Sequence, residues 1–521
     1  MIKKNIIGFS TSDQGELYTQ AFNPKTGETL VGDFSNANNE EVNLAVEKSI
    51  KAFETYRKVS GRQKALFLNA IADEIEILGD LLIERCCAES GLPNARIIGE
   101  RGRTVGQLRM FANLIVEGSW LEASIDVADL KREPIPKPDI RKMLVPMGPV
   151  VVFAASNFPL AFSTAGGDTV SALAGGNPVI VKAHSAHPGT SALIGSAIME
   201  AAKNSGMPDG VFSLLHGSGK VVGQSLIRHS GIKAAGFTGS QVAGRILFDL
   251  ANQRKEPIPF FAEMGSVNPV LLLPTALNNK TIEMLSTSIT MGAGQFCTKP
   301  GLLLTLETDK LEEFINDLSL ALEKIEPSVM LTEKICNAYY NDVDLSLTNQ
   351  DVKVESIFQN KNELNRARSV LVSVSGESFL NNPKLAEEVF GPYSMIVKCK
   401  NEEQLNKILS TLSGQLTGTV FGSESEMQSF ITSIDQLGKK VGRLIFNGVP
   451  TGVEVCSSMQ HGGPYPASSD SRFTSVGTMA IKRFVRPVAF QAWPDSQLPD
   501  ELKNGNPLNI WRLINSEWTK D

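Results

Sequence analysis

Apolar residues recur at helical spacing through the first part of the chain. Residues 40–56, 61–78 and 81–89 place Val, Ile, Leu, Phe and Ala side chains three or four positions apart. Such residues share one face of a helix, so we expect three amphipathic helices that pack on a core. Residues 100–111 follow the same pattern, and Arg103 and Gln107 stand one helical turn apart on a common face. These two side chains either point into solvent or line a pocket for an anionic substrate.

The pattern changes between residues 127 and 147. This segment is rich in charged residues and contains Pro134, Pro136 and Pro138. Proline at this density disfavours a helix, so the segment predicts an extended arm that leaves the domain and returns to it.

Short apolar runs of β character follow, and they alternate with helices of small residues. The predicted strands are 148–155, 179–182, 210–215 and 234–240, and the predicted helices between them include 164–174 and 191–205. This alternation predicts an α/β fold with a parallel sheet covered on both faces. Ligands of such sheets bind at the carboxyl ends of the strands, where Asn157, Lys182, Gly239 and Ser240 stand.

The composition is that of a globular protein of several domains. The chain has 521 residues, 42% of them hydrophobic and 20% charged, and a net charge of -6. This charge gives no reason to expect nucleic acid or an anionic membrane as a partner, and no apolar run approaches the length of a membrane span. Six scattered cysteines show no metal-ligand spacing. We therefore expect reduced thiols, no metal site and a cytoplasmic protein without a signal peptide.

One cysteine stands where a nucleophile would be well placed. Cys297 lies in the stretch GAGQFCTKPG, residues 292–301, whose glycines let backbone N–H groups and a substrate approach the sulfur. A thiolate attacks carbonyl carbon well when it is accessible and its pKa is lowered. An isolated cysteine is more often a small apolar side chain of the core, so the catalytic interpretation needs support from other residues.

Glu263 is a second candidate for chemistry. It lies in FFAEMG, at the end of a predicted strand and between apolar residues. The carboxylate either pairs with a surface lysine or acts as a general base, and we expect apolar surroundings to raise its pKa.

Six motifs, in order, resemble those of the aldehyde dehydrogenase superfamily over nearly the whole chain. They are Asn157-Phe158-Pro159, Val181-Lys182, Phe237-Thr238-Gly239-Ser240, Glu263-Met264-Gly265, Gly294-Gln295-x-Cys297 and Glu388-x-Phe390-Gly391-Pro392. Each motif has a different mechanical role, so their joint occurrence is highly specific.

The resemblance implies a fold and an assembly. We expect a Rossmann-type cofactor domain (1–126 and 148–263), an α/β catalytic domain (264–460), a β oligomerisation arm (127–147 and 481–495) and a C-terminal tail (496–521). The arm would pair 127–147 with a late strand, 481–488, and the protein would be a homo-oligomer, either a dimer or a tetramer.

The resemblance also implies roles for individual residues. Cys297 would attack an aldehyde, and the side-chain amide of Asn157 with the backbone N–H of Cys297 would hold the oxyanion. After hydride transfer, Glu263 would activate the water that hydrolyses the thioester. The cofactor-binding residues would be Lys182, Ser185, Phe237, Gly239, Ser240, Glu388 and Phe390.

One departure from the commonest family pattern concerns the cofactor. Many NAD-using members carry a glutamate three residues after the cofactor lysine, and here that position is Ser185. Without the carboxylate a 2′-phosphate is not repelled, and Lys182 with His184 could attract it. We expect NADP, although Ser185 also permits NAD.

Several local stretches resemble one branch of the family, the 2-oxoglutarate semialdehyde (2,5-dioxovalerate) dehydrogenases. They include residues 89–93, the pattern Glu100-Arg101-x-Arg103-Thr104-x-x-Gln107, His461 to Ala467 and the tail 498–512. The product of that reaction is a dicarboxylate, which needs a cation at the far end of the tunnel. Arg103 would supply it, with Gln107 beside it, and Phe158, Phe162 and Phe473 would line the tunnel.

Two other functions stay open. The first is an NADP-dependent long-chain aldehyde dehydrogenase, which would need only apolar tunnel walls. The second is a cysteine acyltransferase or hydrolase without nicotinamide, which would need a basic partner for the thiol. The five histidines, at 184, 187, 216, 229 and 461, show no local signature of such a partner.

Overall fold

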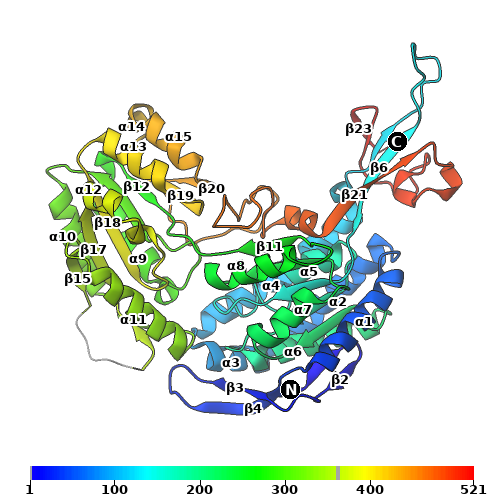
Figure 1. Ribbon diagram of the computed structural model, residues 1–521, viewed down its shortest axis with the longest axis horizontal. Helices are drawn as coiled ribbons and strands as arrows, with labels where there is room; N and C mark the ends of the chain where they lie inside the picture. The colour runs from blue at the N-terminus through cyan, green and yellow to red at the C-terminus, as the bar shows by residue number, and fades with distance from the viewer. Residues whose placement is uncertain (1–2, 359–363, 521) are drawn as a thin grey trace.

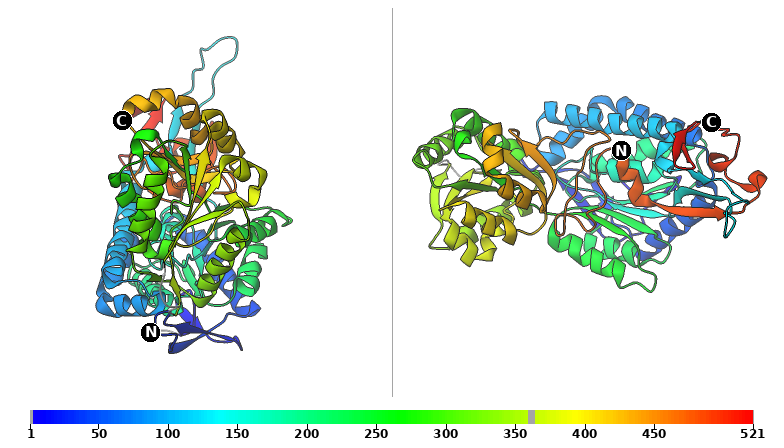
Figure 2. Two further views of the ribbon diagram at one scale, coloured as in Figure 1. Left: turned by 90° about the vertical axis from the view of Figure 1, so that its left-hand side faces the viewer. Right: turned by 90° about the horizontal axis from the view of Figure 1, so that it is seen from above.

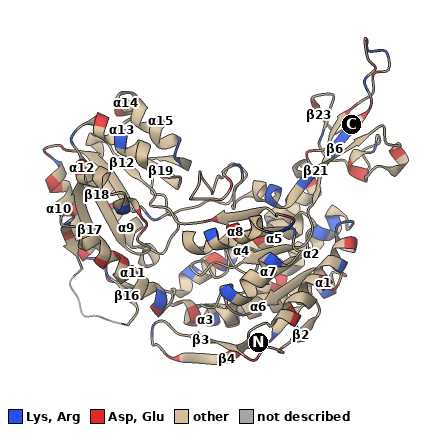
Figure 3. Ribbon diagram, viewed as in Figure 1, with Lys and Arg blue, Asp and Glu red and all other residues tan. Residues whose placement is uncertain are grey.

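The computed structural model describes residues 3–358 and 364–520, which form two α/β bodies and a small β arm (Figure 1). The two bodies lie side by side along the long axis, and the arm projects from the first body at its far end (Figure 2). The predicted α/β fold class is confirmed. Basic and acidic residues are interspersed over both bodies (Figure 3). Among the described helices, none combines the length and apolar character needed to cross a membrane.

The first body is built on a seven-stranded sheet in the order β11-β10-β7-β8-β9-β1-β2. The strands from β11 to β9 run parallel, and β1 and β2 extend the edge antiparallel. The bounds are β1 Asn5–Ile7, β2 Ser10–Ser12, β7 Val150–Phe153, β8 Val179–Lys182, β9 Phe212–Leu215, β10 Ala234–Thr238 and β11 Phe260–Glu263.

Helices cover both faces of this sheet, which is why its strands are almost wholly apolar. Val150 and Val152 of β7 face one core with helices α2 to α6, whereas Val151 and Phe153 face a second core with α1, α7 and α8. The bounds are α1 Asn39–Tyr56, α2 Gly61–Ile77, α3 Gly79–Ser90, α4 Asn94–Glu117, α5 Gly167–Ala174, α6 Pro188–Asn204, α7 Gln224–Arg228 and α8 Gln241–Asn252. A separate hairpin, β3 Tyr18–Phe22 with β4 Thr29–Ser35, lies at the edge.

The second body holds another seven-stranded sheet, in the order β15-β17-β18-β13-β12-β19-β20. Only the β15–β17 pair is antiparallel among its described pairings. The bounds are β12 Val270–Leu272, β13 Leu302–Leu306, β15 Lys353–Ile357, β17 Val370–Ser375, β18 Tyr393–Cys399, β19 Gln415–Phe421 and β20 Val441–Phe446. Its helices are α9 Asn279–Thr290, α10 Leu311–Glu323, α11 Glu333–Leu347, α12 Gly376–Asn381, α13 Glu402–Thr411, α14 Glu424–Ser429 and α15 Ile431–Gly438, and a small pair joins β14 Ser328–Val329 to β16 Arg366–Ala367.

The arm is a five-stranded sheet in the order β21-β6-β5-β22-β23. Its central pairing joins β6 (Ile140–Pro146) to β21 (Val485–Gln491) antiparallel, as expected for 127–147 and the late strand. The other strands are β5 Ser124–Asp126, β22 Arg512–Ile514 and β23 Glu517–Thr519. Since β22 and β23 belong to this sheet, the C-terminal tail is part of the arm and not a separate segment.

Two predicted elements begin later than their sequence suggested. The helix predicted from 164 starts at Gly167, because residues 156–166 form turns and Gly166 is extended. The strand predicted from 481 starts at Val485, because η6 (Thr478–Phe484) is a 3₁₀ helix whose Ile481 and Phe484 are buried in the first core. Apolar residues in a short run suit a buried turn as well as a strand, so periodicity could not separate them.

Candidate active site

The chain reverses sharply just before Cys297. The 3₁₀ turn η4 (Met291–Gly294) holds Gly292, Ala293 and Gly294 at φ values of 57°, 56° and 64°. This left-handed region favours glycine. A side chain at Gly294 would also place its Cβ 2.3 Å from the carbonyl carbon of Gly391. The glycines of this stretch therefore allow the loop to pack closely against the second sheet.

Buried amides hold the cysteine loop in place. The side-chain amide of Asn268 donates to the carbonyl oxygens of Cys297 and Lys299, at 2.8 and 3.0 Å. The Gln295 side chain donates to Gly292 O at 3.0 Å and accepts from Leu331 N at 3.0 Å. With its backbone tied at these points, Cys297 is positioned before any substrate binds.

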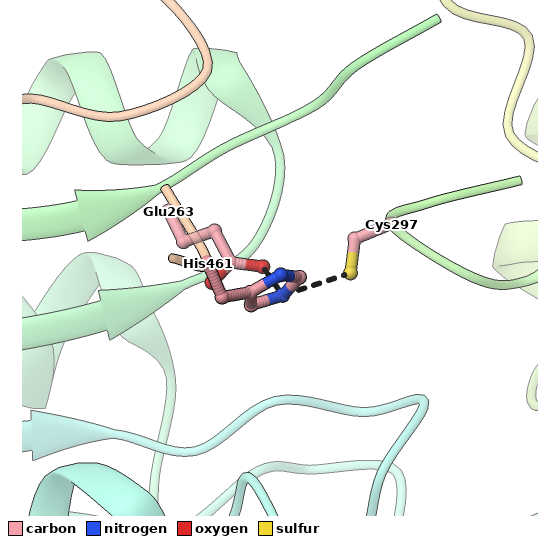
Figure 4. Close-up of side chains that lie close together, drawn as sticks. All are labelled: Glu263, Cys297 and His461. Atoms are coloured by element: carbon pink, nitrogen blue, oxygen red, sulfur yellow. Dashed lines mark hydrogen bonds and ion pairs between the residues drawn. The ribbon is translucent and has the colours of Figure 1, made fainter. Parts of the chain in front are cut away.

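Three side chains from distant parts of the chain meet at this loop (Figure 4). His461 Nε2 lies 3.6 Å from the Sγ of Cys297 and 2.9 Å from Oε1 of Glu263. Glu263 is the last residue of β11, and His461 comes from the segment between β20 and η6. The contact with Oε1 is an ion-pair contact, and Oε1 makes no hydrogen bond to the described residues. In the sequence, His461 was recognised only as part of a stretch that resembles one branch of the family. Its position beside Cys297 was not predicted.

Glu263 is an ionised carboxylate. Burial alone would raise its pKa, but the charge and polar contact of His461, with hydrogen bonds from Ser475 and Cys297, lower that pKa to about 2. The Ser475 Oγ donates to Oε2 at 2.6 Å. The expectation of a raised pKa was therefore wrong, because a histidine that lies almost two hundred residues later in the chain faces the carboxylate in the fold.

Cys297 rests as a thiol. Burial, and then the charge of Glu263, raise the pKa of its sulfur well above the usual value, while its own backbone N–H lowers it. The lowered pKa that makes a thiolate an effective nucleophile is not found in this state. Attack on a carbonyl therefore requires transfer of the thiol proton, and the Glu263–His461 pair, within 4.8 Å of the sulfur, is the acceptor.

Asn157, the predicted oxyanion residue, lies against the cysteine loop. Its side-chain N–H donates to the carbonyl of Gln295 at 3.0 Å. Glu100 of α4, which sequence reasoning did not select, fixes the loop that carries Asn157. Its buried carboxylate accepts from Leu160 N at 2.9 Å and Ala161 N at 3.0 Å.

Aromatic rings form a row that leads to the histidine. Phe158 lies 5.2 Å from Phe162 and 5.3 Å from Phe296, and Phe162 lies 6.2 Å from the ring of His461. We call these four residues the aromatic row. Phe473, the third predicted tunnel residue, packs its ring 5.2 Å from Phe261 of β11.

Arg103 and Gln107 both reach the interior from α4. The Arg103 guanidinium lies 5.3 Å from the centre of the Phe162 ring. Its Nε and one terminal nitrogen are buried without a hydrogen-bond partner among the described residues, and so is the side-chain nitrogen of Gln107. Burial, more than any other effect, lowers the pKa of Arg103. Glu100 pairs instead with Arg96, at 3.1 Å.

The predicted cofactor residues lie at the carboxyl edge of the first sheet. Ser240 caps α8, whose first turn is exposed, and an exposed helix N-terminus can hold a pyrophosphate. Lys182 ends β8, where burial lowers its pKa to about 8, and Ser185 nearby is exposed. Phe237 is buried beneath Gly239 in the second core, so its ring supports the turn.

Two further features bear on the cofactor. His184 is a neutral imidazole, because burial and then the charges of His187 and Lys182 lower its pKa well below the usual value. It cannot attract a phosphate as a cation.

Glu388 packs against Gly265, where an added Cβ would lie 2.0 Å from Oε2 of Glu388. Burial raises the pKa of Glu388 to about 7, although Lys299 lies nearby. Phe390 is half-buried next to it.

Comparisons with known proteins agree with this geometry. Residues 9–335 match the model of the aldehyde dehydrogenase family. The chain is 48% identical over 499 residues to alpha-ketoglutaric semialdehyde dehydrogenase 2 of Azospirillum brasilense, with 95% of each chain covered. It is 46% identical to alpha-ketoglutaric semialdehyde dehydrogenase of Acinetobacter baylyi, with 94% of this chain and 93% of that one covered.

Solved structures share the fold. Betaine aldehyde dehydrogenase of Staphylococcus aureus matches with a TM-score of 0.81 at 18% identity and covers 96% of this chain and 99% of its own. A 1-pyrroline-5-carboxylate dehydrogenase from Thermus, with bound NAD, matches with a TM-score of 0.79 at 20% identity and covers 94% of this chain and 92% of its own. The chain belongs to the aldehyde dehydrogenase family and is an NAD(P)-dependent oxidoreductase that converts an aldehyde to an acid.

Proposed function

We propose that the substrate is 2-oxoglutarate semialdehyde and the product 2-oxoglutarate. The observation that carries this proposal is the half-buried Arg103, whose guanidinium has two buried nitrogens without hydrogen-bond partners among the described residues and lies over Phe162 of the aromatic row. An unpaired buried cation is costly, and a substrate carboxylate would relieve that cost. The two bacterial relatives at 46% and 48% identity, both alpha-ketoglutaric semialdehyde dehydrogenases, support the same substrate.

Gln107 fits the rest of such a substrate. Its side-chain nitrogen is a buried donor one turn from Arg103, without a partner among the described residues. The 2-oxo group of the substrate is an acceptor next to the carboxylate, so Gln107 would donate to it. The aromatic row would then contact the methylene groups between the 2-oxo acid and the aldehyde.

The chemistry would begin with the thiol proton of Cys297. The Glu263–His461 pair accepts this proton as the sulfur attacks the aldehyde carbon and forms a hemithioacetal. The Asn157 amide and the backbone N–H of Cys297 stabilise the oxyanion. A nicotinamide cofactor held by Lys182, Ser240 and Glu388 would supply the hydride acceptor, and loss of hydride would turn the hemithioacetal into a thioester on Cys297. Water then attacks this thioester, and the Glu263–His461 pair takes its proton.

Lys182, Ser240 and Glu388 would hold the cofactor. The exposed first turn of α8 suits the pyrophosphate. Position 185, near Lys182, carries a serine and not an acidic side chain. We propose that NADP is preferred, since Lys182 can attract a 2′-phosphate that Ser185 does not repel. Glu388 would accept hydrogen bonds from the nicotinamide ribose, and Phe390 would lie near the ring.

The arm would join copies of the chain. Its projecting loop exposes Leu130 and Ile135, and Trp493, which follows β21, is also exposed. Covering them would remove apolar surface from water. We propose a homo-oligomer, either a dimer or a tetramer, which light scattering during gel filtration would measure.

A side-by-side kinetic comparison tests the substrate. The purified enzyme with NADP is given 2-oxoglutarate semialdehyde in one series and a long-chain aldehyde in the other, and kcat/KM is measured for each. We expect the semialdehyde to be favoured. A preference for the long-chain aldehyde would support the alternative function, in which the aromatic row binds a fatty chain.

A further inference from the structure

Glu263, Cys297 and His461 make up a set of metal ligands as well as a catalytic cluster. Each offers one ligand atom, an oxygen, a sulfur and a nitrogen, and the three atoms all lie within 4.8 Å of one another. Thiolate and imidazole ligands favour zinc and similar ions, whereas magnesium and calcium prefer oxygen ligands alone. The residues are far apart in the sequence, so no short spacing could reveal the set.

The distances suit a tetrahedral ion. Zinc lies about 2.3 Å from sulfur and about 2.0–2.1 Å from nitrogen, so these two ligands stand roughly 3.5–3.6 Å apart at the tetrahedral angle. The observed distance between Sγ of Cys297 and Nε2 of His461 is 3.6 Å. Nε2 and Oε1 of Glu263, now 2.9 Å apart, would have to separate by roughly 0.4–0.5 Å. That contact is an ion pair without a hydrogen bond, so no hydrogen bond between the two side chains opposes this separation.

The charges are also matched. Glu263 would bind as a carboxylate, and a cysteine that binds zinc gives up its proton. Two anionic ligands and one neutral imidazole would balance a divalent cation, which removes much of the cost of burying it. Three protein ligands leave a fourth position for water.

We propose that this cluster binds Zn²⁺ and that the ion reversibly inhibits the enzyme. The bound ion would engage both the sulfur that attacks the aldehyde and the carboxylate that accepts protons, so no acyl-enzyme could form. Binding releases the thiol proton to solvent and changes no oxidation state. Removal of the ion by a chelator would restore the thiol and the activity.

Direct binding tests this site without relying on turnover. Cd²⁺, which shares the ligand preference of zinc and gives an ultraviolet band when a thiolate binds it, is titrated into the chelator-treated full-length enzyme. We expect one ion per chain with a thiolate band. Cys297→Ala should abolish the band, and His461→Ala and Glu263→Gln should each weaken binding by at least about tenfold, as the loss of even a supporting partner does. The same weakening is expected for Zn²⁺ by calorimetry.

Cys456→Ser is the matched control, because Cys456 is an exposed free cysteine outside the cluster. This variant should bind Cd²⁺ as the wild type does. Thermal unfolding of each variant shows whether it is folded. If Cys456→Ser loses the band, or if folded His461→Ala and Glu263→Gln bind Cd²⁺ as tightly as the wild type, the proposed site is wrong.

Discussion

The guanidinium of Arg103 lies 5.3 Å from the centre of the Phe162 ring, and Phe162 in turn lies 6.2 Å from the ring of His461. A half-buried cation thus lies one aromatic ring away from the histidine that contacts Cys297. The thiolate form of Cys297 would raise the pKa of Arg103 against the effect of burial, so the two charges interact. The site therefore holds a cation, Arg103, as well as the residues proposed to react, Cys297 and His461.

Arg103→Met should therefore discriminate between substrates. A charge-assisted hydrogen bond to a carboxylate contributes about 1.5–3 kcal/mol. Since each 1.4 kcal/mol is a factor of ten, KM for 2-oxoglutarate semialdehyde should rise roughly ten- to a hundredfold. Hexanal, which has no carboxylate, should be oxidised as well as before or better. Initial rates with both aldehydes measure the effect.

Arg109→Met is the matched control for that change. Arg109 lies on the same helix, but it is partly exposed and pairs with Asp73 and Glu76 on the surface. Exposed ion pairs contribute little, so this variant should keep the wild-type KM. Equal losses for both aldehydes in Arg103→Met would show that Arg103 is structural and would favour the long-chain substrate.

Glu263→Gln should slow hydrolysis of the thioester more than its formation, because an amide cannot accept the proton of the attacking water. Rapid mixing with aldehyde and NADP should then show a burst of reduced nicotinamide, close to one equivalent per active site, followed by very slow turnover. A variant that produced no burst would show that Glu263 is needed earlier, for the proton of Cys297.

His461→Phe should move the acidic limb of the pH–rate profile to higher pH. In the wild type, His461 is the largest of the influences that lower the pKa of Glu263, and burial opposes it. Without His461, burial prevails and the pKa of Glu263 rises. Below this new pKa the carboxyl is protonated and accepts no proton, so activity should fall at a pH at least about one unit above the wild-type limb.

Ser475→Ala serves as the comparison for His461→Phe. It removes one hydrogen bond to Glu263 but leaves the imidazole in place, so its limb should move in the same direction by less. The measurement is the profile of kcat against pH for the wild type, His461→Phe and Ser475→Ala. If the limb in His461→Phe coincided with that of the wild type, Glu263 would not depend on His461.

Ser185→Glu should shift cofactor preference from NADP toward NAD. The new carboxylate would stand at an exposed position close to Lys182, where it would repel a 2′-phosphate and could accept hydrogen bonds from ribose hydroxyls. The ratio of kcat/KM values for the two cofactors measures the shift. Ser185→Gln is the neutral control and should move the ratio less. An unchanged ratio in Ser185→Glu would show that another residue discriminates.

Much of the fold could be predicted from periodicity and turn residues. The strand 179–182 and the helices that begin near 40 and 61 were placed within a residue or two, because their apolar positions follow a single period and their ends carry turn or capping residues. The 3₁₀ helix before β21 was not predicted, since its burial comes from packing against the first body and not from any period in its own residues.

The sequence by itself determined the family, and it singled out the candidate nucleophile, acid and oxyanion amide. These depend on local chemistry, in which glycines at fixed positions allow a sharp turn and a close approach to one sulfur. Only the tertiary structure decided the electrostatics of the site. Protonation depends on distances of a few ångströms between side chains, and His461 faces Glu263 at 2.9 Å although 198 positions separate them (461 − 263 = 198). For this reason the pKa of Glu263 is lowered where its sequence neighbours predicted that it would be raised.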